Sequence, residues 1–573
     1  MTNEPLPKLR VAITGHRDLD PSGLEQVRRT LAEVLVTLRE RVGPATIEVT
    51  TGMADGADQL AVAVAEELGL AVRAVLPKPL AEYRNELSPA GRDGLDELLS
   101  DQTQPVGVVA SSAPGLGDDD AAPYLNLGRF LARDSHVVVA LWDGGSERKP
   151  GGTLDVLARF VDRSYSADID NDPPRTIEPR DGAAQNTGPV GVWIPAARVD
   201  GPSMAASTPR FVIGTGVRGV WRTTDSMPTE LLELLGGTAE TARITRASKP
   251  LENAYALLDD LPAGLSSDER ASLSAVHESY LAADGLAGHY QKRSDRSSIG
   301  AALIAGSMGF AFLWFAKIDD NLFWLYAYLA LFALGYVAYR LARDRHWLRR
   351  HLAFRATAET LRVEFFARLL GIADQLDARE IMDQTGVSGF RGFGWAREAA
   401  RTGSPLVLDR PPQVVTHSDL VSSAWVDDQA RYFGRRTHLL HRRHARLELV
   451  QRLLYVLSLV AVVVVILFGD ELKKQYAPGH VSAKTIVIFL MGLLPLWLTL
   501  WELHQDRMAT KELHWQYRNQ AELFAHASLA LRDPGTDVDL AEVYLKLAER
   551  SLFETYLWTI HRYHREFAPP SGG

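Results

Sequence analysis

Residues 297–316 read SSIGAALIAGSMGFAFLWFA, twenty residues without one charged side chain. The chain as a whole is 23% charged, and a window of this length in such a chain would ordinarily hold about four or five charges. Further charge-free stretches, rich in Leu, Val, Ile, Phe and Ala, lie at 321–339, 453–469 and 485–501. A helix needs about 17 to 25 apolar residues to cross the hydrocarbon core of a membrane. We therefore predict four transmembrane helices in two hairpins, with long buried core helices as the alternative.

The charges beside these stretches predict how the chain is oriented. Clusters of arginine and lysine precede the first span, follow the second and precede the third, whereas the loop between the first two spans is short and acidic. Because basic flanks stay on the cytoplasmic side, the N- and C-termini are both expected in the cytoplasm. The first residues lack the apolar core of a signal peptide, so residues 1 to about 295 are expected to stay in the cytoplasm.

The composition excludes several classes of function. A chain of 573 residues is too long for one ordinary domain. Its 62 Lys and Arg against 71 Asp and Glu leave a net charge of −9, which argues against a general nucleic-acid binder. The chain has no cysteine, which excludes disulfides, thiolate zinc sites, cysteine-ligated iron–sulfur clusters and thiol nucleophiles. We predict no cofactor, no metal site and no nucleic-acid partner.

The first 200 residues alternate between short apolar runs and amphipathic helical stretches. The runs have the length of buried parallel strands. They lie at Leu9–Thr14, Ile47–Thr51, Ala71–Leu76, Val106–Ala110, His136–Trp142 and Val190–Ile194. This alternation predicts a doubly wound α/β domain at 1–200, whose ligands would bind outside the carboxyl ends of the strands. Residues 201–295, with no strand pattern after about Val217, are predicted to form a helical connector to the membrane region.

Glycine-containing loops follow three of the predicted strands. They are 14–18 (TGHRD), 52–58 (GMADGAD) and 142–145 (WDGG), the last followed by 150–153 (PGGT). Glycine lets a backbone approach a phosphate closely, and a helix N-terminus attracts anions. We therefore predict a nucleotide site in which Arg17 pairs with a phosphate and Asp55 or Asp58 binds ribose hydroxyls. In the alternative, the glycines only make turns, Asp58 caps the following helix, and His16 and Arg17 form a solvated surface pair.

These loops resemble the SLOG superfamily, whose domains have Rossmann-like folds. The resemblance covers roughly residues 8–197 and rests on the GHR, GMADGAD, LP with a following tyrosine, AxWDG and PGGT elements. It implies these candidate ligand-binding residues: Gly15, His16, Arg17, Gly52, Met53, Asp55, Gly56, Asp58, Tyr83, Trp142, Asp143, Gly151, Gly152 and Thr153. Sequences of the hydrolase branch resemble the signature PGGxGTxxE, whereas in this sequence PGGT is followed directly by Leu154 and Asp155. We therefore name no catalytic residue and favour a sensor of nucleotide-derived second messengers.

The membrane half contains an internal repeat. The string H-x-x-[FY]-R-x-x-A-E occurs twice at a constant offset of 163 residues, and each copy follows a predicted hairpin, which indicates duplication. Its shared polar positions are His351, Arg355 and Glu359 in the first copy and His514, Arg518 and Glu522 in the second. Residues spaced by four share one helix face, and Arg followed by Glu at that spacing can pair. The repeat is either a solvated, salt-bridged helix or a coupling helix on which the sensor acts.

This half resembles the SLATT membrane effectors that accompany SLOG proteins. We divide it into a first SLATT-like unit at 296–395 and a second at 396–573. The resemblance implies an anti-phage effector of the bacterial inner (plasma) membrane that forms a pore when its sensor binds a nucleotide-derived ligand, a cyclic nucleotide or an ADP-ribose derivative. The alternatives are a membrane-tethered nucleotide hydrolase, similar to phosphoribohydrolases, and a non-conducting membrane scaffold or receptor.

The spans themselves bear on the pore hypothesis. They carry no ionisable residue, which argues against a selective transporter with its own site. Four apolar helices cannot enclose a wide aqueous path, so a pore requires a homo-oligomer. Small residues in the first span, at Ala301, Ala302, Ala305, Gly306 and Gly309, suit close helix packing either between subunits or within one.

Overall fold

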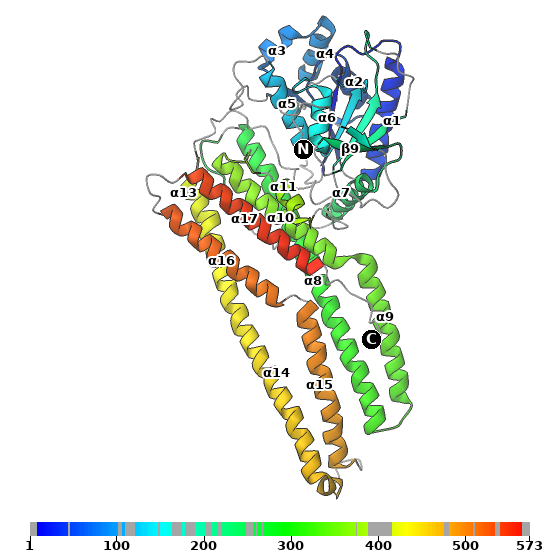
Figure 1. The fold of residues 1–573 in the computed structure, drawn as a ribbon, viewed down its shortest axis with the longest axis vertical. Coiled ribbons are helices and arrows are strands. Elements are labelled where there is room, and N and C mark those ends of the chain that lie inside the picture. The colour runs from blue at the N-terminus through cyan, green and yellow to red at the C-terminus, as the bar shows by residue number, and fades with distance from the viewer. Residues whose placement is uncertain are drawn as a thin grey trace. The chain divides into compact units, whose positions relative to one another are not determined.

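The computed structural model describes most of the chain. The described residues are 8–43, 46–100, 106–108, 121–146, 149–162, 175–177, 189–201, 208–215, 219–247, 256–258, 260–265, 267–373, 375–376, 378–387, 393, 415–474, 481–507, 510–532 and 539–563. They fall into two compact units, the first comprising Met1–Ala282 with Thr360–Val414 and the second Ala283–Glu359 with Val415–Gly573. Two continuous helices, α8 (Ser267–Lys317) and α10 (Trp347–Leu370), belong to both units (Figure 1).

The first unit contains a sheet whose described strands number nine, in the order β4-β3-β2-β1-β5-β7-β8-β9-β6. The strands are β1 (Lys8–Gly15), β2 (Thr46–Thr51), β3 (Ala71–Leu76), β4 (Val106–Val108), β5 (Val137–Trp142), β6 (Arg175–Ile177), β7 (Val190–Pro195), β8 (Arg210–Gly214) and β9 (Val220–Thr224). From β4 to β7 all neighbours run parallel. Each predicted strand is present, so the predicted α/β domain is confirmed; residues 109–110 of the fourth run lie outside the described residues.

Two strands correct the predicted end of this domain at residue 200. β8 pairs antiparallel with β7 and β9 pairs antiparallel with β8, so the sheet extends to Thr224. The helical connector predicted from residue 201 therefore begins only with α7 (Thr229–Ala247). Phe211, Val212 and Ile213 are buried in the sheet. With only three consecutive apolar residues, this run is too short for its pattern to predict a strand.

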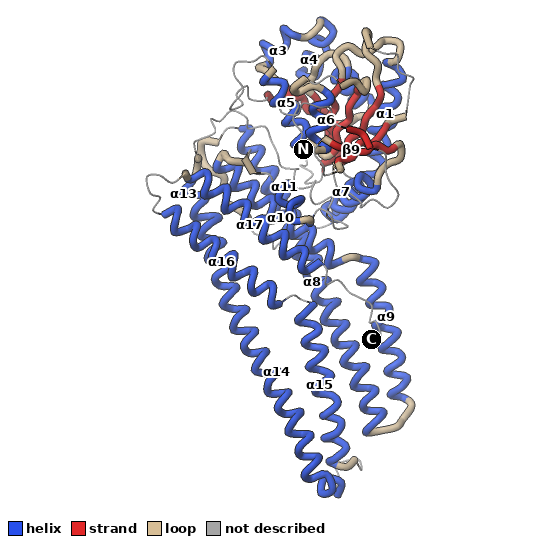
Figure 2. Tube along the Cα trace, in the orientation of Figure 1, coloured by secondary structure: helices blue, strands red, loops and turns tan. Residues whose placement is uncertain are grey.

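Helices cover the sheet in two groups (Figure 2). They are α1 (Leu24–Val42), α2 (Ala57–Glu67), α3 (Leu80–Glu86), α4 (Pro89–Ser100), α5 (Ala122–Asp134) and α6 (Thr153–Val161). Helices α1 and α2 pack together, as do α5 and α6. From β1 the chain adds β2, β3 and β4 on one side of β1, and it then returns to place β5 on the other side. Because the crossovers between parallel strands are right-handed, this reversal places α5 and α6 on the face of the sheet opposite α1 and α2. The carboxyl ends of β1, β2, β3 and β5 consequently share one edge.

The helical remainder of the chain contains four helices long and apolar enough to span a membrane. They are parts of α8, α9 (Phe323–Arg345), α14 (Asp428–Lys474) and α15 (Ala483–Arg507), and they contain the predicted spans except for residues 321–322, which precede α9. The other described helices of this region, besides α10, are α11 (Ala378–Thr385), α13 (Ser418–Val421), the π-helical turn η2 (Ser422–Asp427), α16 (Thr510–Arg532) and α17 (Leu540–Tyr563). Ile466 and Leu467 are 73% and 68% exposed, as expected of side chains that face lipid.

Small residues of the first span pack against the fourth within the same chain. A Cβ at Gly306 would lie 3.1 Å from the indole of Trp497, and one at Gly309 would overlap the side chain of Leu496. Glycine at these two positions therefore lets α15 approach α8 closely. Of the two alternatives for the small residues, the structure shows packing within one chain for Gly306 and Gly309.

Candidate functional site

The loops that follow β1 and β2 interlock through their backbones. The Ala57 N–H donates to the His16 carbonyl at 3.0 Å. Gly56 has φ +76°, and a Cβ there would overlap the Arg17 carbonyl. Only glycine fits a position with that backbone conformation and no room for a side chain. A Cβ at Gly15 would likewise overlap Ala57. The predicted glycine loops therefore fix each other, and Arg17 projects beside them with its side chain exposed.

A second link joins the loop after β1 to the loop after β5. His16 Nε2 accepts from the Asp143 N–H at 3.2 Å and lies 3.1 Å from Asp143 Oδ1. Trp142, in contrast, is only 7% exposed. Its ring packs on Trp193 and Trp221, at centroid distances of 5.0 and 6.3 Å. The structure thus brings His16 and Asp143 together at the loop edge, but it places the predicted ligand residue Trp142 in the hydrophobic core.

Both candidate ribose-binding carboxylates have internal hydrogen-bond partners. Asp55 accepts from the Ser88 N–H at 3.0 Å and from the Ser88 hydroxyl at 2.6 Å, just before α4 begins. Asp58 is buried and accepts from the Ala54 N–H at 3.1 Å within its own loop. Asp58 does not cap α2, because the N-cap residue of that helix is Gly56 and no side chain caps it; Asp58 instead holds its own loop. Asp55 holds Ser88, the residue before α4, a contact that the sequence did not predict. We therefore do not assign the ribose to either residue.

Burial raises the pKa of Asp58 to about 6, although the Ala54 N–H, Thr51 and Arg17 favour the ionised form. The folded protein therefore binds this proton more tightly than the unfolded chain does, so protonation stabilises the loop as pH falls through 6. We expect the opening free energy of 52–58 to be higher at pH 5 than at pH 7.5, by on the order of 1 to 3 kcal/mol.

Hydrogen exchange of this segment, corrected for the intrinsic pH dependence, measures that difference. The Asp58→Asn variant keeps an acceptor for the Ala54 N–H but has no proton to gain, so its opening free energy should be the same at both pH values. A wild-type loop with equal protection at pH 5 and pH 7.5 would contradict the prediction.

The carboxylate of Asp155, a residue that does not match the family signature, holds the PGGT loop in its conformation. Asp155 accepts from the Gly151 N–H at 2.9 Å and from Arg159 at 2.8 Å, and its side chain is buried. Gly151 has φ +73°, and a Cβ there would overlap the Tyr124 carbonyl at the start of α5. Gly152 precedes α6, and Thr153, its first residue, is buried. The loop is therefore built to pack against α5.

Sequence reasoning missed three residues beside Arg17. Lys78 follows β3, Glu86 ends α3, and Tyr124 lies in the first turn of α5. The Arg17 guanidinium lies 5.3 Å and the Lys78 ammonium 5.7 Å from the centroid of the Tyr124 ring. We call Arg17, Lys78, Glu86 and Tyr124 the Tyr124 cluster. The sequence offered one signal for Lys78: it lies two residues after the end of a strand, as Arg17 does, and is therefore expected at the same edge of the sheet.

Three predicted ligand residues pack on the inner side of these loops. Tyr83 is 1% exposed, and its burial, with Asp58 nearby, raises the pKa of its phenol. Met53 is fully buried and has φ +58°. Gly52 lies against Leu127 of α5, since a Cβ there would approach the Leu127 side chain to 2.7 Å. Tyr83, Met53 and Gly52 therefore support the loops from below rather than presenting a side chain to a ligand.

The two copies of the repeated helix differ in their surroundings within the second unit. Arg355 pairs with Asp284 of α8 at 2.9 Å and also with Glu359. Its neighbour His351 is buried, where Nδ1 donates to the Ala287 carbonyl at 3.0 Å. The first copy therefore joins α10 to α8.

The second copy lies on α16, where Arg518 and Glu522 are exposed to solvent. Arg518 pairs with Glu522 at 2.9 Å, and these side chains are 67% and 57% exposed. The ring of His514 stacks near His441 of α14, with the centroids 6.0 Å apart. The Arg518–Glu522 pair thus has the geometry of a solvated helix pair, whereas the Arg355 pair is structural.

This difference predicts unequal effects of the same substitution. Arg355→Ala leaves Asp284 and Glu359 without their shared cation and should lower stability by about 2 to 3 kcal/mol. Arg518→Ala breaks an exposed pair and should cost less than about 1 kcal/mol. Thermal midpoints of the two variants in one detergent give the comparison. Equal midpoints would show that burial of the first copy does not stabilise the protein.

No family model matches the chain, and no curated protein matches it. Among the residues that the structure describes, no group of three or more His, Asp or Glu side chains is arranged to hold a metal ion.

Proposed function

We propose that the chain is a nucleotide-gated membrane effector, with a SLOG-like, Rossmann-like sensor at its N-terminal end. The observation that carries the proposal is the convergence of the loops after β1, β2 and β5, with an exposed arginine beside them. The parallel strand order β3-β2-β1-β5-β7 supports it, because ligands of such sheets bind where the strand order reverses. The reversal lies between β1 and β5, at His16 and Asp143.

The membrane region is the proposed effector. Four apolar helices in two hairpins, each hairpin followed by a copy of the repeat, support a duplicated SLATT-like architecture. We propose that several copies of the chain assemble in a bacterial plasma membrane, with both termini in the cytoplasm, and that the assembly permeabilises the membrane in anti-phage defence. Helices α8 and α10 are shared by both units, so they are the proposed route from sensor to membrane.

The contacts of Asp155 favour a sensor over a nucleotide hydrolase. A hydrolase of the related type needs a carboxylate beside the PGGT loop that is available to the substrate. Here the carboxylate of Asp155 is buried and accepts from Gly151 and Arg159. It holds the loop in shape instead of facing a reacting bond.

Dye release from proteoliposomes tests the function directly. The full-length protein is reconstituted in vesicles loaded with a quenched dye, and cyclic dinucleotides, cyclic trinucleotides, ADP-ribose and cyclic ADP-ribose are added in turn. One of these compounds should release the dye in a dose-dependent manner, and protein-free vesicles should stay intact. Tight binding of a compound with no release of dye or ions would contradict a pore. Enzymatic turnover of the compound would favour the hydrolase.

Arg17→Ala tests the site itself. Removing a cation from a phosphate usually costs about 1.5 to 3 kcal/mol, so affinity for the releasing nucleotide should fall roughly 10- to 150-fold. Calorimetry on the detergent-purified protein measures the change. Arg28→Ala, which removes an exposed arginine of α1, is the control and should bind like wild type. Unchanged affinity in Arg17→Ala would place the nucleotide elsewhere.

A further inference from the structure

The Tyr124 cluster brings two cations and a phenol to one carboxylate. Lys78 Nζ donates to Glu86 Oε1 at 2.7 Å, and the Tyr124 hydroxyl donates to Glu86 Oε2. Arg17 and Lys78 both lie against the ring of Tyr124, so the two cations flank the same side chain. The four residues come from four separate segments that meet at the carboxyl edge of the sheet.

These donors are of the kind that binds phosphate. A guanidinium, an ammonium and a hydroxyl together offer charge and several N–H and O–H groups to an oxyanion. Lys78 is only 13% exposed and Glu86 is 31% exposed, so the carboxylate is partly desolvated yet reachable from solvent. Burial alone would raise the pKa of Glu86, but the hydrogen bonds from Lys78 and Tyr124 outweigh it and lower that pKa. Glu86 is therefore an anion at neutral pH.

We propose that Glu86 occupies the place of a ligand phosphate. Its carboxylate neutralises Lys78 and accepts from the Tyr124 hydroxyl when no nucleotide is bound, and a phosphate or pyrophosphate group of the nucleotide replaces it. The inference rests on the proposed function for the kind of ligand, and it adds the part of the ligand that is recognised. Because Glu86 ends α3 and Tyr124 begins α5, the exchange also breaks a direct link between these helices.

Inorganic pyrophosphate is the probe, because it offers the proposed group without a base or a ribose. Its dissociation constant is measured by calorimetry on the detergent-purified full-length protein. Glu86→Gln removes the competing charge while keeping the shape of the side chain, so pyrophosphate should bind about 5- to 20-fold more tightly than to wild type. Lys78→Met should abolish this gain when it is combined with Glu86→Gln, because the gain depends on the freed ammonium.

Glu82→Gln is the matched control. Glu82 lies one turn earlier on α3, with its carboxylate 3.6 Å from Lys78 and its side chain 61% exposed. The Glu82→Gln substitution changes the net charge by the same amount as Glu86→Gln, and the affinity of this variant for pyrophosphate should differ from that of wild type by less than about 2-fold. Equal gains in the two variants would overturn the proposal, since a general charge effect would then explain them. Unchanged or weaker binding by Glu86→Gln would overturn it as well.

The pyrophosphate measurement and the dye-release assay fail independently. If nucleotides release dye but Glu86→Gln leaves pyrophosphate affinity unchanged, the proposed function stands and this inference is wrong. If Glu86→Gln tightens pyrophosphate binding in the Lys78-dependent manner but no nucleotide releases dye, the phosphate subsite stands and the gating function is wrong.

Discussion

Gly56→Ala is expected to lower nucleotide affinity more than 100-fold. The added Cβ would overlap the Arg17 carbonyl, and the backbone at φ +76° disfavours any side chain. Strain of this kind costs about 1 to 3 kcal/mol, and overpacking adds roughly another 1 to 3 kcal/mol. The loop can relieve the strain and the overlap only by moving away from Arg17. Arg17, the proposed partner of the phosphate, would then no longer lie against the loop after β2.

Gly69→Ala is the matched control for this prediction. Gly69 also has positive φ, +64°, but no heavy atom lies within 4 Å of the position its Cβ would take. It follows the end of α2 and precedes β3, so it lies at the edge of the sheet opposite the loops. The variant should lose some stability and keep its nucleotide affinity. Calorimetry on both variants settles the comparison, and equal losses of affinity would mean that loop packing is not what positions Arg17.

The fold was predictable where one physical demand dominates a long segment. Charge-free stretches of 17 to 20 residues fit a membrane span and little else, and buried parallel strands read as apolar runs. The hairpin of β8 and β9 was not predicted, because the consecutive apolar residues number only three in β8, Phe211 to Ile213, and two in β9, Val220 and Trp221. In so short a run, an alternating pattern is hard to separate from a turn.

The candidate site was predictable only in part. Glycines with positive φ, such as Gly56 and Gly151, mark the loops in the sequence because no other residue suits those backbones. The hydrogen bonds that Asp55 accepts from Ser88 could not be predicted, because Ser88 is distant in the sequence. Likewise, Lys78 and Tyr124 become neighbours of Arg17 only when β3 and α5 take their places in the fold.

The repeat shows a related limit. Arg355 and Arg518 occupy identical places in the string, yet only Arg355 has a carboxylate from another helix beside it. At the constant offset of 163, position 284 corresponds to position 447, where the sequence has leucine instead of aspartate. The two copies therefore share the repeated motif but not the aspartate that pairs with its arginine. The motif alone could not predict this difference.

Helix α5 connects the candidate ligand site to the end of α10. Its first half contacts the loops: Tyr124 lies against Arg17, and a Cβ at Gly128 would lie 3.0 Å from Gly151. At its last turn, Arg133 donates to the carbonyls of Ala373 at 2.6 Å and Leu376 at 3.2 Å, directly after α10 ends. A helix of 13 residues is about 20 Å long. A displacement at one end of so short a helix reaches the other end.

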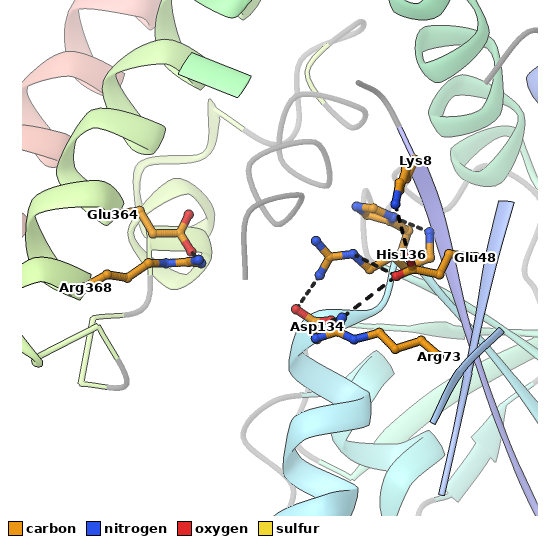
Figure 3. A network of polar contacts seen from close by, with 8 residues as sticks. Lys8, Glu48, Arg73, Asp134, His136, Glu364 and Arg368 are labelled. Atoms are coloured by element: carbon orange, nitrogen blue, oxygen red, sulfur yellow. Dashed lines mark hydrogen bonds and ion pairs between the residues drawn. The ribbon is translucent and has the colours of Figure 1, made fainter. Parts of the chain in front are cut away.

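The last turn of α5 is also held firmly to the sheet. Asp134 accepts from Arg10 at 2.5 Å and from Arg73 at 2.9 Å, and all three side chains are buried (Figure 3). Burial alone would raise the pKa of Asp134, but the two arginines lower it, so the carboxylate stays ionised. Glu364 and Arg368 of α10 pair with each other in the same view. The last turn of α5 and the strands that carry Arg10 and Arg73 therefore move as one body, and a displacement of α5 shifts them together.

We expect Arg133→Ala to remove most nucleotide-triggered dye release while changing nucleotide affinity only a few-fold. A ligand drives a conformational change only through its different affinities for two states, so the sensor must contact the helices that lead to the membrane. Arg133 makes such a contact at the end of α10, a helix that also belongs to the membrane unit. Affinity should fall slightly, because coupling between two sites is reciprocal and typically amounts to about 1 to 3 kcal/mol.

Arg129→Ala is the control, since it removes an arginine one turn earlier on α5 and leaves both carbonyl contacts of Arg133 intact. The variant should release dye like wild type. Dye release and calorimetry are measured on the same preparations, so a loss of binding is distinguished from a loss of transmission. Full release by Arg133→Ala, with wild-type expression and assembly, would exclude α5 as the route. The proposed signal would then have to pass along α8, the other helix that contributes to both units.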